Sequence, residues 1–286
     1  MRIAVTGAGG QLGGELCRQL KTAAVPLDVP DFDLTVSESV RQSLLAVGPT
    51  AVINTAAYTQ VDRAEQDPDC CRQINAAGVG YLAQVCSELN IPLVQISTDY
   101  VFGADQTRSA PYREEDEPGP QGVYGQSKLA GERQAASWAR HLIVRSCGLY
   151  GKPGPKTPGN FVETMLRLGQ ERSSLRIVGD QHCTPSYVPH VARAILFLLN
   201  SGARGTFHVV NRGATTWYDF AQEIFRIAGL EVTLERITTA EYGAPAPRPG
   251  YSVLDASRYY SLGGPPMPAW QDALAEYLAE RLSRAE

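Results

Sequence analysis

The sequence predicts an α/β fold in which a doubly wound parallel sheet is followed by a smaller C-terminal lobe. Two observations lead to this prediction. In the first half, short aliphatic or β-branched runs alternate with stretches of helical period, which is the pattern of a parallel sheet with helices on both faces. After Tyr150 the pattern changes to segments rich in proline and glycine, which break helices and central strands.

Four apolar runs are the expected strands of this sheet. They are residues 3–6, 51–55, 93–97 and 142–145. Between them, apolar residues recur every three, four or seven positions, as in helices that pack one face on a sheet. The recurring residues are Leu12, Leu16 and Leu20 in the first stretch, and Ile74, Leu82, Cys86 and Leu89 in the second. Unrelated amphipathic segments would not alternate so regularly with strands.

The second half is divided by two segments rich in proline and glycine, residues 151–159 and 243–250. Both are expected to be loops, the first of them over a cleft. A helix is expected at residues 270–282. We therefore expect one domain at residues 1–150 and a smaller lobe at residues 151–286, with some segments of the lobe returning to the sheet.

The composition is that of an ordinary globular protein, with 43% hydrophobic and 20% charged residues and a formal net charge of -4. This charge gives no electrostatic basis for binding DNA, RNA or an anionic membrane. No apolar run reaches the roughly 20 residues that span a bilayer, and no secretory leader precedes the first expected strand. The sequence therefore predicts a cytoplasmic protein with neither a nucleic-acid nor a membrane partner.

The cysteines give no sign of a metal site or a disulfide framework. They are Cys17, Cys70, Cys71, Cys86, Cys147 and Cys183. None forms a C-x-x-C pair, and several lie in apolar segments. We expect buried, reduced thiols, which behave as small hydrophobic side chains.

A glycine-rich segment follows the first expected strand and opens the first expected helix. Gly7, Gly10 and Gly13 have the spacing G-x-x-G-x-x-G, with Gln11 and Leu12 between the last two. Glycines permit a tight turn and let backbone N–H groups and the helix N-terminus approach a pyrophosphate. A plain tight turn is the alternative, but the strand–turn–helix context favours a Rossmann-like dinucleotide site.

Further residues are candidates for the same dinucleotide. Asp28 ends the next apolar run, where an acidic residue often accepts hydrogen bonds from the adenosine ribose; a surface turn aspartate is an equally good interpretation. Asp33 and Leu34 follow, and they resemble the pair that flanks the adenine ring in extended short-chain dehydrogenases. Ala56 and Ala57, with Tyr58 after them, follow the strand at residues 51–55, and their small side chains let a cofactor lie across its carboxyl end.

Tyr124 and Lys128 are four residues apart, so on a helix both project from one face. A phenol is a poor acid near neutral pH, and a neighbouring ammonium favours its phenolate form. Thr98 lies just past the strand at residues 93–97, where its hydroxyl can meet a substrate carbonyl oxygen. The alternatives without a catalytic role are that Tyr124 and Lys128 form a pair on the helix surface and that Thr98 caps the next turn. The interval between Thr98 and Tyr124 resembles that in short-chain dehydrogenases, which implies proton transfer by Tyr124 during hydride transfer, with Lys128 at the nicotinamide ribose.

These motifs resemble those of the dTDP-4-dehydrorhamnose reductases, a family of the extended short-chain dehydrogenase/reductase superfamily. The similar segments are residues 10–13, 56–59, 61–62, 64–65, 97–102, 124–132, 160–161, 180–181, 215–218 and 248–249. The resemblance implies reduction of the 4-keto group of a nucleotide-linked deoxysugar by NADH or NADPH, most closely dTDP-4-dehydro-L-rhamnose to dTDP-L-rhamnose. It implies a dinucleotide-binding domain at residues 1–150, a mainly substrate-binding lobe at residues 151–286, and a monomer or homodimer.

The resemblance also implies roles for individual residues. Thr98, Tyr124 and Lys128 are the expected catalytic residues. The expected substrate contacts are Thr98, Asp99, Tyr124 and Arg248. Trp217 is left between packing and binding, because a tryptophan at a helix start more often packs.

The sequence departs from the family pattern at two places. Some members bind magnesium through glutamates at a dimer interface; Glu15 matches one of these, but Pro189 stands at the other position, so no metal site is expected. Gly148 stands where some members carry a pocket tryptophan. The sugar pocket is then larger unless a neighbour fills the space, and Tyr150 and Trp217 are the candidates.

Two other functions compete with this prediction. A nucleotide-sugar dehydratase or epimerase has the same fold, but dehydratases place an acid–base glutamate directly after Thr-Asp, where this chain has Tyr100. A non-catalytic dinucleotide-binding regulatory subunit, similar to that of methionine adenosyltransferase, is the second alternative. The complete set of Thr98, Tyr124 and Lys128 favours a reductase, either of dTDP-4-dehydro-L-rhamnose or of another nucleotide-linked 4-keto sugar.

Overall fold

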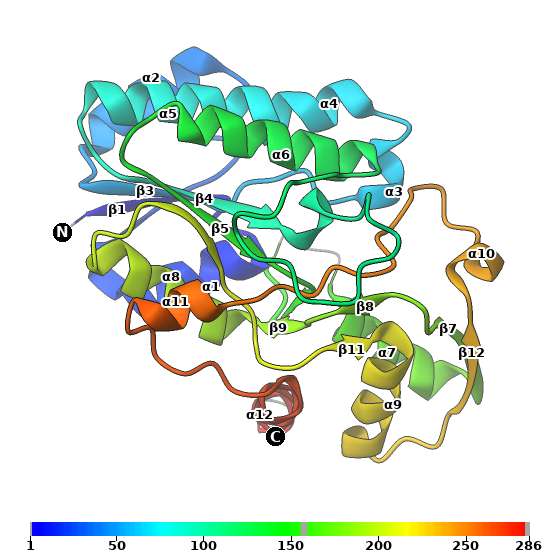
Figure 1. Ribbon diagram of the computed structural model, residues 1–286. Coiled ribbons are helices and arrows are strands. Elements are labelled where there is room, and N and C mark those ends of the chain that lie inside the picture. Colours follow the sequence, from blue (N-terminus) through cyan, green and yellow to red (C-terminus); the bar gives the residue numbers. More distant parts are fainter. Residues whose placement is uncertain (1, 156–158, 284–286) are drawn as a thin grey trace.

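The computed structural model describes residues 2–155 and 159–283. Its centre is a parallel sheet of six strands in the order β10-β5-β4-β3-β1-β2 (Figure 1). The strands are β1 (Ile3–Thr6), β2 (Ala24–Leu27), β3 (Ala51–Asn54), β4 (Leu93–Thr98), β5 (His141–Ser146) and β10 (Gly205–His208). The predicted fold class is confirmed, and each of the four predicted strands ends within one residue of its expected limits.

Helices cover both faces of the sheet (Figure 1). One face carries α1 (Gln11–Leu20), α8 (Val188–Asn200) and α11 (Ser257–Ser261), and the other carries α2 (Ser37–Val47), α5 (Gly78–Glu88) and α6 (Val123–Ala136). Strands β1, β3 and β4 are buried along their whole length. Strands covered on both faces need apolar residues at successive positions, which explains the uninterrupted aliphatic runs in the sequence.

The strand order reverses at β1, because β2 pairs with one of its edges and β3 with the other. In open parallel sheets, ligands bind beyond the carboxyl ends of the strands where the order reverses. The Thr55 hydroxyl lies at this point and donates to the carbonyl of Thr6 at 2.6 Å. It joins the segment after β3 to the glycine-rich turn after β1.

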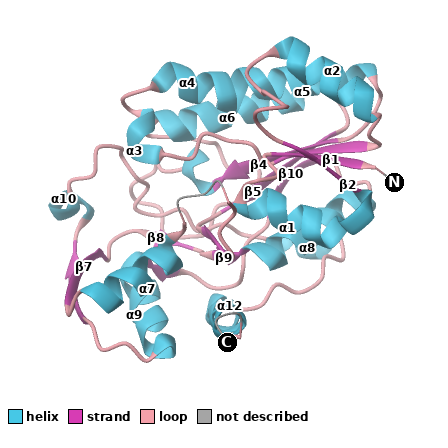
Figure 2. Ribbon diagram, turned by 180° about the vertical axis from the view of Figure 1, so that it is seen from behind, coloured by secondary structure: helices cyan, strands magenta, loops and turns pink. Residues whose placement is uncertain are grey.

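The C-terminal half builds a smaller lobe and also returns to the sheet (Figure 2). In the lobe, β7 (Ser174–Val178) pairs with β12 (Thr233–Ile237), β8 (His182–Cys183) with β11 (Thr215–Thr216), and β6 (Leu149–Tyr150) with β9 (Ser186–Tyr187). Its helices are α7 (Phe161–Glu171), α9 (Trp217–Ala228), α10 (Thr239–Tyr242) and α12 (Trp270–Leu282). Tyr150, Phe220 and Tyr277 lie in its core. Helix α12 has the limits predicted for it.

The helical run before β4 is not a regular α-helix throughout. α4 (Pro68–Arg72) passes into a π-helical turn, η2 (Gln73–Ala77), and then into α5. Asn75 of this turn accepts from the Tyr58 N–H at 2.9 Å and donates to the Tyr58 carbonyl at 3.1 Å. The π-helical turn thereby fixes the segment after β3, which leads into α3 (Val61–Ala64). Two short helices, η1 (Lys21–Ala23) and η3 (Asp99–Val101), follow α1 and β4.

No helix in the described part of the chain is long and apolar enough to cross a membrane. The six cysteines are free thiols. Four of them are buried, Cys17 is half-buried and Cys70 is exposed on α4. The expectation of a buried thiol is therefore wrong for Cys70, because α4 turns this residue away from the apolar core.

Candidate active site

A cleft of about 620 Å³ lies where the strand order reverses. The turn after β1, the ends of β2, β3 and β4, and the first turns of α6 form its walls. Every residue predicted to hold a dinucleotide lines this cleft: Gly7, Gly10, Gln11, Leu12, Gly13, Asp28, Asp33, Leu34, Ala56, Ala57, Tyr58, Tyr124 and Lys128. The structure therefore brings together residues that are far apart in the sequence.

The glycine-rich turn has no room for side chains. Gly7 has a φ of +68°, and a Cβ atom there would lie 2.7 Å from the backbone of Ala56. A Cβ atom on Gly13 would collide with the carbonyl oxygen of Gly7. Helix α1 begins directly behind the turn, and its N-cap residue, Gly10, has no side chain that could cap it. The first N–H groups of α1 and its dipole make this turn a suitable site for a pyrophosphate.

Asp28 links the end of β2 to the glycine-rich turn. Its carboxylate accepts hydrogen bonds from the backbone N–H groups of Gly9, at 2.6 Å, and Val29, at 2.8 Å. Asp33, also in the wall, accepts from the backbone N–H and the hydroxyl of Thr35. Of the described residues that line the cleft, Lys128 alone is a lysine or arginine. Asp28 and Asp33 are thus the charged side chains at this end among the described residues of the wall.

Thr98 and Tyr124 meet at the other end of the cleft. Thr98 is the last residue of β4, and Tyr124 is the second residue of α6. Desolvation by the surrounding walls raises the pKa of Tyr124 above its usual value, and a hydrogen bond from the Thr98 side chain opposes this shift. The sequence predicted that the Lys128 ammonium lowers the pKa of this phenol. In the structure desolvation dominates, so the phenol is protonated at neutral pH.

Lys128 lies one helical turn beyond Tyr124 and is buried. Its Nζ donates to the backbone carbonyl of Ile96 at 2.6 Å. Burial lowers the pKa of Lys128 to about 8, while the nearby Glu132 carboxylate acts in the opposite direction. The ammonium is consequently held at the wall of the cleft by the carboxyl half of β4.

Asp99 lies behind Thr98 and is not part of the wall of the cleft. Its carboxyl group accepts hydrogen bonds from Ser252 at 2.6 Å, from the Cys147 thiol at 3.0 Å and from the Thr98 hydroxyl at 3.2 Å. Burial raises the pKa of Asp99, and these hydrogen bonds oppose the shift. The geometry does not place Asp99 at a surface that a substrate reaches; it places this residue among the groups that hold Thr98.

A second cavity, of about 790 Å³, lies mainly in the C-terminal lobe. Tyr100 forms part of its wall, and the Tyr100 ring packs edge to face with Tyr124 at 5.9 Å between centroids. Apolar side chains from α7 and β7 form most of the remaining wall, and three arginines complete it: Arg172, Arg176 and Arg248. The sequence pointed to Arg248 but not to the other two, because nothing in the pattern of α7 and β7 distinguishes a cavity wall from an ordinary apolar face.

Gly148 and Trp217 are neighbours across the two lobes. A Cβ atom on Gly148 would lie 3.2 Å from the Trp217 ring and 3.2 Å from the backbone of Pro185, and Gly148 has a φ of +51°. Gly148 lines the cleft, whereas Trp217 lines the second cavity and packs on Phe161. Trp217 therefore fills the space beside Gly148. Tyr150, the other candidate, is buried in the lobe core.

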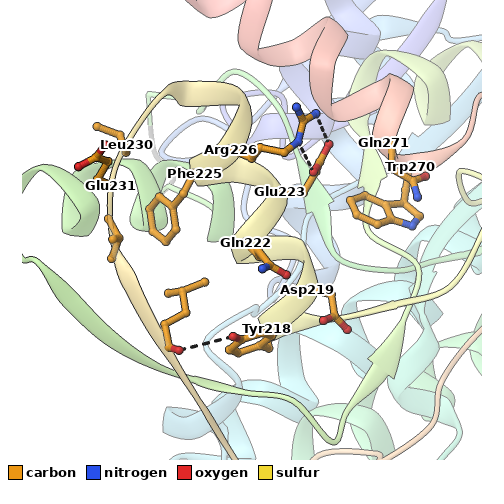
Figure 3. Close-up of a pocket in the computed structure, with 12 residues that line it drawn as sticks. Tyr218, Asp219, Gln222, Glu223, Phe225, Arg226, Leu230, Glu231, Trp270 and Gln271 are labelled. Atoms are coloured by element: carbon orange, nitrogen blue, oxygen red, sulfur yellow. Dashed lines mark hydrogen bonds and ion pairs between the residues drawn. The ribbon is translucent and has the colours of Figure 1, made fainter.

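A third hollow lies on the outer side of α9, and Figure 3 shows its side chains. Glu223 and Arg226 pair with each other at its edge, and the Tyr218 hydroxyl donates to the carbonyl of Leu234. None of the residues predicted to bind or react lines this hollow. Except for Asp99, which lies behind Thr98, the residues predicted to bind or react line the cleft or the second cavity.

The described residues contain no group of three or more His, Cys, Asp or Glu side chains placed to hold a metal ion. Glu15 is paired with Arg18 at 2.6 Å and also accepts from Gln19. The Gln19 amide donates to the carbonyl of Pro189 as well. The Glu15 carboxylate is thus committed to neighbours on its own helix.

The fold and the site together define an oxidoreductase of the extended short-chain class, with a doubly wound parallel sheet and a Thr–Tyr–Lys set at the end of its cleft. Within this class, the chain belongs to the dTDP-4-dehydrorhamnose reductase family. The family model described as the RmlD substrate binding domain matches residues 1–283. The resemblance inferred from the sequence motifs is confirmed.

Individual relatives cover nearly the whole chain. The spore coat polysaccharide biosynthesis protein SpsK of Bacillus subtilis is 41% identical over 100% of this chain and 99% of its own. A dTDP-4-dehydrorhamnose reductase of Streptomyces griseus is 38% identical, covering 99% of this chain and 95% of its own. The crystal structure of a dTDP-4-dehydrorhamnose reductase from Bacillus anthracis, in complex with NADP, is 38% identical with a TM-score of 0.93, covering 98% of this chain and 99% of that one.

Proposed function

We propose that this protein uses NADH or NADPH to reduce the 4-keto group of a nucleotide-linked deoxysugar, converting dTDP-4-dehydro-L-rhamnose to dTDP-L-rhamnose. The observation that carries this proposal is the meeting of Thr98 and Tyr124 where the dinucleotide cleft adjoins a second cavity that contains arginines. The names of the relatives from Streptomyces griseus and Bacillus anthracis, and the NADP bound to the latter, support the same reaction.

The cleft fits a nicotinamide dinucleotide. Gly7 and Gly13 leave space for a pyrophosphate at the N-terminus of α1, whose N-cap residue is the glycine Gly10. Asp28 and Asp33 would lie near the adenosine, and Lys128 would hold the nicotinamide ribose. When bound, the reduced nicotinamide supplies the hydride for the carbonyl carbon.

Tyr124 is the proposed proton donor to the carbonyl oxygen. Its raised pKa keeps the phenol protonated at neutral pH, which is the form that a reduction requires. The Thr98 hydroxyl, which donates to Asp99 at 3.2 Å in this structure, would turn to donate to the phenolate left after proton transfer and stabilise it. Donors fixed in a partly dry site stabilise developing negative charge more strongly than water does.

The second cavity is the proposed site of the nucleotide part of the substrate. Its apolar wall, with Phe161 and Trp217, suits a base, and its arginines suit a diphosphate. Tyr100 stands where a dehydratase would need an acid–base carboxylate, and burial raises the pKa of this phenol. A neutral phenol is a poor carrier for the second proton of a dehydration, so a simple ketone reduction is favoured.

The test is to mix the purified protein with NADH or NADPH and dTDP-4-keto-6-deoxy sugars and to follow the loss of absorbance by reduced nicotinamide. We expect turnover with dTDP-4-dehydro-L-rhamnose and formation of dTDP-L-rhamnose. Turnover with a different 4-keto sugar only would assign another nucleotide-sugar reductase. Binding of the dinucleotide without any turnover would favour the regulatory-subunit alternative. Gel filtration with and without substrate distinguishes a monomer from a homodimer.

A further inference from the structure

We propose that Asp62 and Glu65 are positioning residues on one short segment. Asp62 positions Arg248, the arginine proposed to bind the substrate, and Glu65 positions the start of α6, the catalytic helix that carries Tyr124. This inference rests on the proposed function, because it takes Arg248 to bind the diphosphate of a nucleotide-linked sugar. The segment runs from the end of β3 through α3. Both carboxylates lie outside the dinucleotide cleft and the second cavity, so neither touches the reacting groups.

Asp62 holds the loop that carries Arg248. One carboxylate oxygen accepts from the Arg248 guanidinium at 2.9 Å, and the other accepts from the backbone N–H of Ala246 at 3.2 Å. Arg248 also donates to the carbonyl of Ala246 at 3.0 Å. The hydrogen bond from Arg248 lowers the pKa of Asp62, so the carboxylate is ionised at neutral pH. The guanidinium is therefore fixed at two of its nitrogens.

This arrangement leaves the guanidinium able to bind a ligand. A guanidinium has five N–H donors, and Asp62 and Ala246 accept from only part of them. The Arg248 side chain is 16% exposed and forms part of the wall of the second cavity. Holding a flexible side chain in place before binding reduces the entropy that binding loses. Asp62 therefore prepares Arg248 for an anionic ligand.

Glu65 caps the catalytic helix from outside. The N-cap residue of α6, Gly122, provides no side-chain cap. Instead, the Glu65 carboxylate accepts from the backbone N–H of Val123 at 2.8 Å. A carboxylate at a helix N-terminus satisfies a free N–H group and interacts favourably with the helix dipole. Because Tyr124 is the next residue, this cap fixes the backbone that places the phenol.

The two contacts are physically connected. A Cβ atom on Gly122 would lie 2.8 Å from the Glu65 carboxylate and 3.4 Å from the ring of Pro247, in the loop held by Asp62. The same chain segment, just before α3, lines the dinucleotide cleft with Tyr58, Thr59 and Gln60. The segment at residues 58–65 thus contacts the dinucleotide cleft, the loop that carries Arg248 and the start of α6.

The first experiment replaces Asp62 by asparagine, with Asp69→Asn as the matched control. Asp69 is a neighbouring acid on α4 whose side chain is 97% exposed. Isothermal titration with dTDP should show affinity weakened about three- to tenfold in Asp62→Asn, the range expected when one long side chain must be ordered on binding. The KM for the nucleotide sugar should rise equally, with kcat and NADH affinity within about twofold of the wild type. An unchanged dTDP affinity, or a tighter one, overturns the role of Asp62.

The second experiment compares Glu65→Ala with Glu65→Gln and the control Glu223→Ala, which removes a paired acid from the outer side of α9. Glu65→Ala should lower kcat roughly tenfold, because a small displacement of a reacting group is costly. Its affinities for dTDP and NADH should change by less than about twofold. Glu65→Gln should recover most of kcat, since its carbonyl oxygen accepts the same N–H. Retention of more than half of kcat in Glu65→Ala contradicts the proposal.

If Glu65→Ala does not fold, Gly122→Ala tests the same cap. Its new methyl group presses on the Glu65 carboxylate without removing it. This variant should also lower kcat while leaving the KM for NADH unchanged; a wild-type kcat overturns the role of the cap. Failure of the proposed function gives a different result, namely a wild-type protein that binds dTDP and NADH but reduces no dTDP-4-keto sugar. The dTDP affinity of Asp62→Asn tests the positioning role in that case as well.

Discussion

Burial sets the protonation states of the proposed catalytic residues. Desolvation raises the pKa of Tyr124, lowers the pKa of Lys128 to about 8 and raises the pKa of Asp99. Despite the first two shifts both groups carry a proton at neutral pH, so Tyr124 has a proton to give and Lys128 remains mostly cationic, while the raised pKa makes Tyr124 a weaker acid than a free phenol. The sequence indicated which residues take part. It could not indicate these shifts, because desolvation depends on the walls around each group.

Replacing Tyr124 by phenylalanine should remove most turnover and leave cofactor affinity nearly intact, because the ring stays and the proton donor is lost. General acid catalysis contributes on the order of 10²–10⁴ in rate. The measurements are single-turnover kinetics and NADH titration. If the variant kept more than about a tenth of the wild-type rate, Tyr124 would not be the acid.

The rate of reduction should fall as the pH rises through about 8, since Lys128 loses its charge there. Tyr124 does not cause this fall, because its raised pKa keeps the phenol protonated over the same range. The measurement is the pH profile of kcat/KM. Lys128→Arg provides a comparison, since a guanidinium stays charged and any remaining activity should lack this step. A wild-type profile that is flat up to about pH 10 would falsify the assignment.

NADH should serve at least as well as NADPH. Asp28 would repel a 2′-phosphate, and Asp31 lies in the adjoining hollow. No lysine or arginine lines the described part of the cleft near Asp28. The measurement is the ratio of the kcat/KM values for the two cofactors. A preference for NADPH above about tenfold, or roughly 1.4 kcal/mol, would show that a basic side chain reaches the ribose from elsewhere.

The junction between β5 and α9 shows how elements of different lobes combine. Gly148 follows β5 and has no side chain, while Trp217 begins α9 and supplies an indole to the same place. From the sequence, Gly148 was expected to enlarge the pocket and a tryptophan there to narrow it. The positive φ and the 3.2 Å approach to Pro185 show that a Gly148→Trp variant would be strained. Trp217 is therefore the better residue to change.

Replacing Trp217 by alanine should lower kcat/KM for the nucleotide sugar at least about tenfold, a change of roughly 1.4 kcal/mol, and broaden the range of sugars accepted. The indole is expected to provide contact area that alanine cannot replace. The kcat/KM of Trp217→Phe should lie between those of the wild type and Trp217→Ala. Trp138→Phe is the control, because Trp138 lies beyond the end of α6 and donates to the carbonyl of Ile91. An unchanged ranking of sugars in Trp217→Ala would show that the indole does not face the substrate.

The elements differ in how well the sequence predicted them. Long strands buried on both faces, such as β4, leave an uninterrupted apolar run, and α12 begins and ends where its pattern does. Strands of two residues, such as β8 and β11, leave no pattern at all. The dinucleotide cleft was predictable because its turn needs glycines. The second cavity was not, because most of its wall comes from α7 and β7, which the sequence did not reveal, although Trp217 and Arg248 were singled out.

At the scale of the whole molecule, the two proposed binding sites meet where the lobes meet. The cleft belongs mainly to the sheet, the second cavity mainly to the C-terminal lobe, and Tyr100 and Tyr124 pack at their junction. A hydride donor and a sugar could therefore approach each other from opposite sides. The division of the chain at Tyr150 remains a prediction about which part performs which task.

The return of α8 and β10 to the sheet limits how the chain can be cut. β10 pairs with β5 along its whole length, and α8 packs on α1 over the apolar core that contains Leu16. A fragment ending at Tyr150 would leave β5 as an unpaired edge and expose one apolar face of the sheet, both of which favour aggregation. The dinucleotide-binding part is therefore not a module that evolution or an engineer could transplant by itself; it is completed only when the last third of the chain has been made.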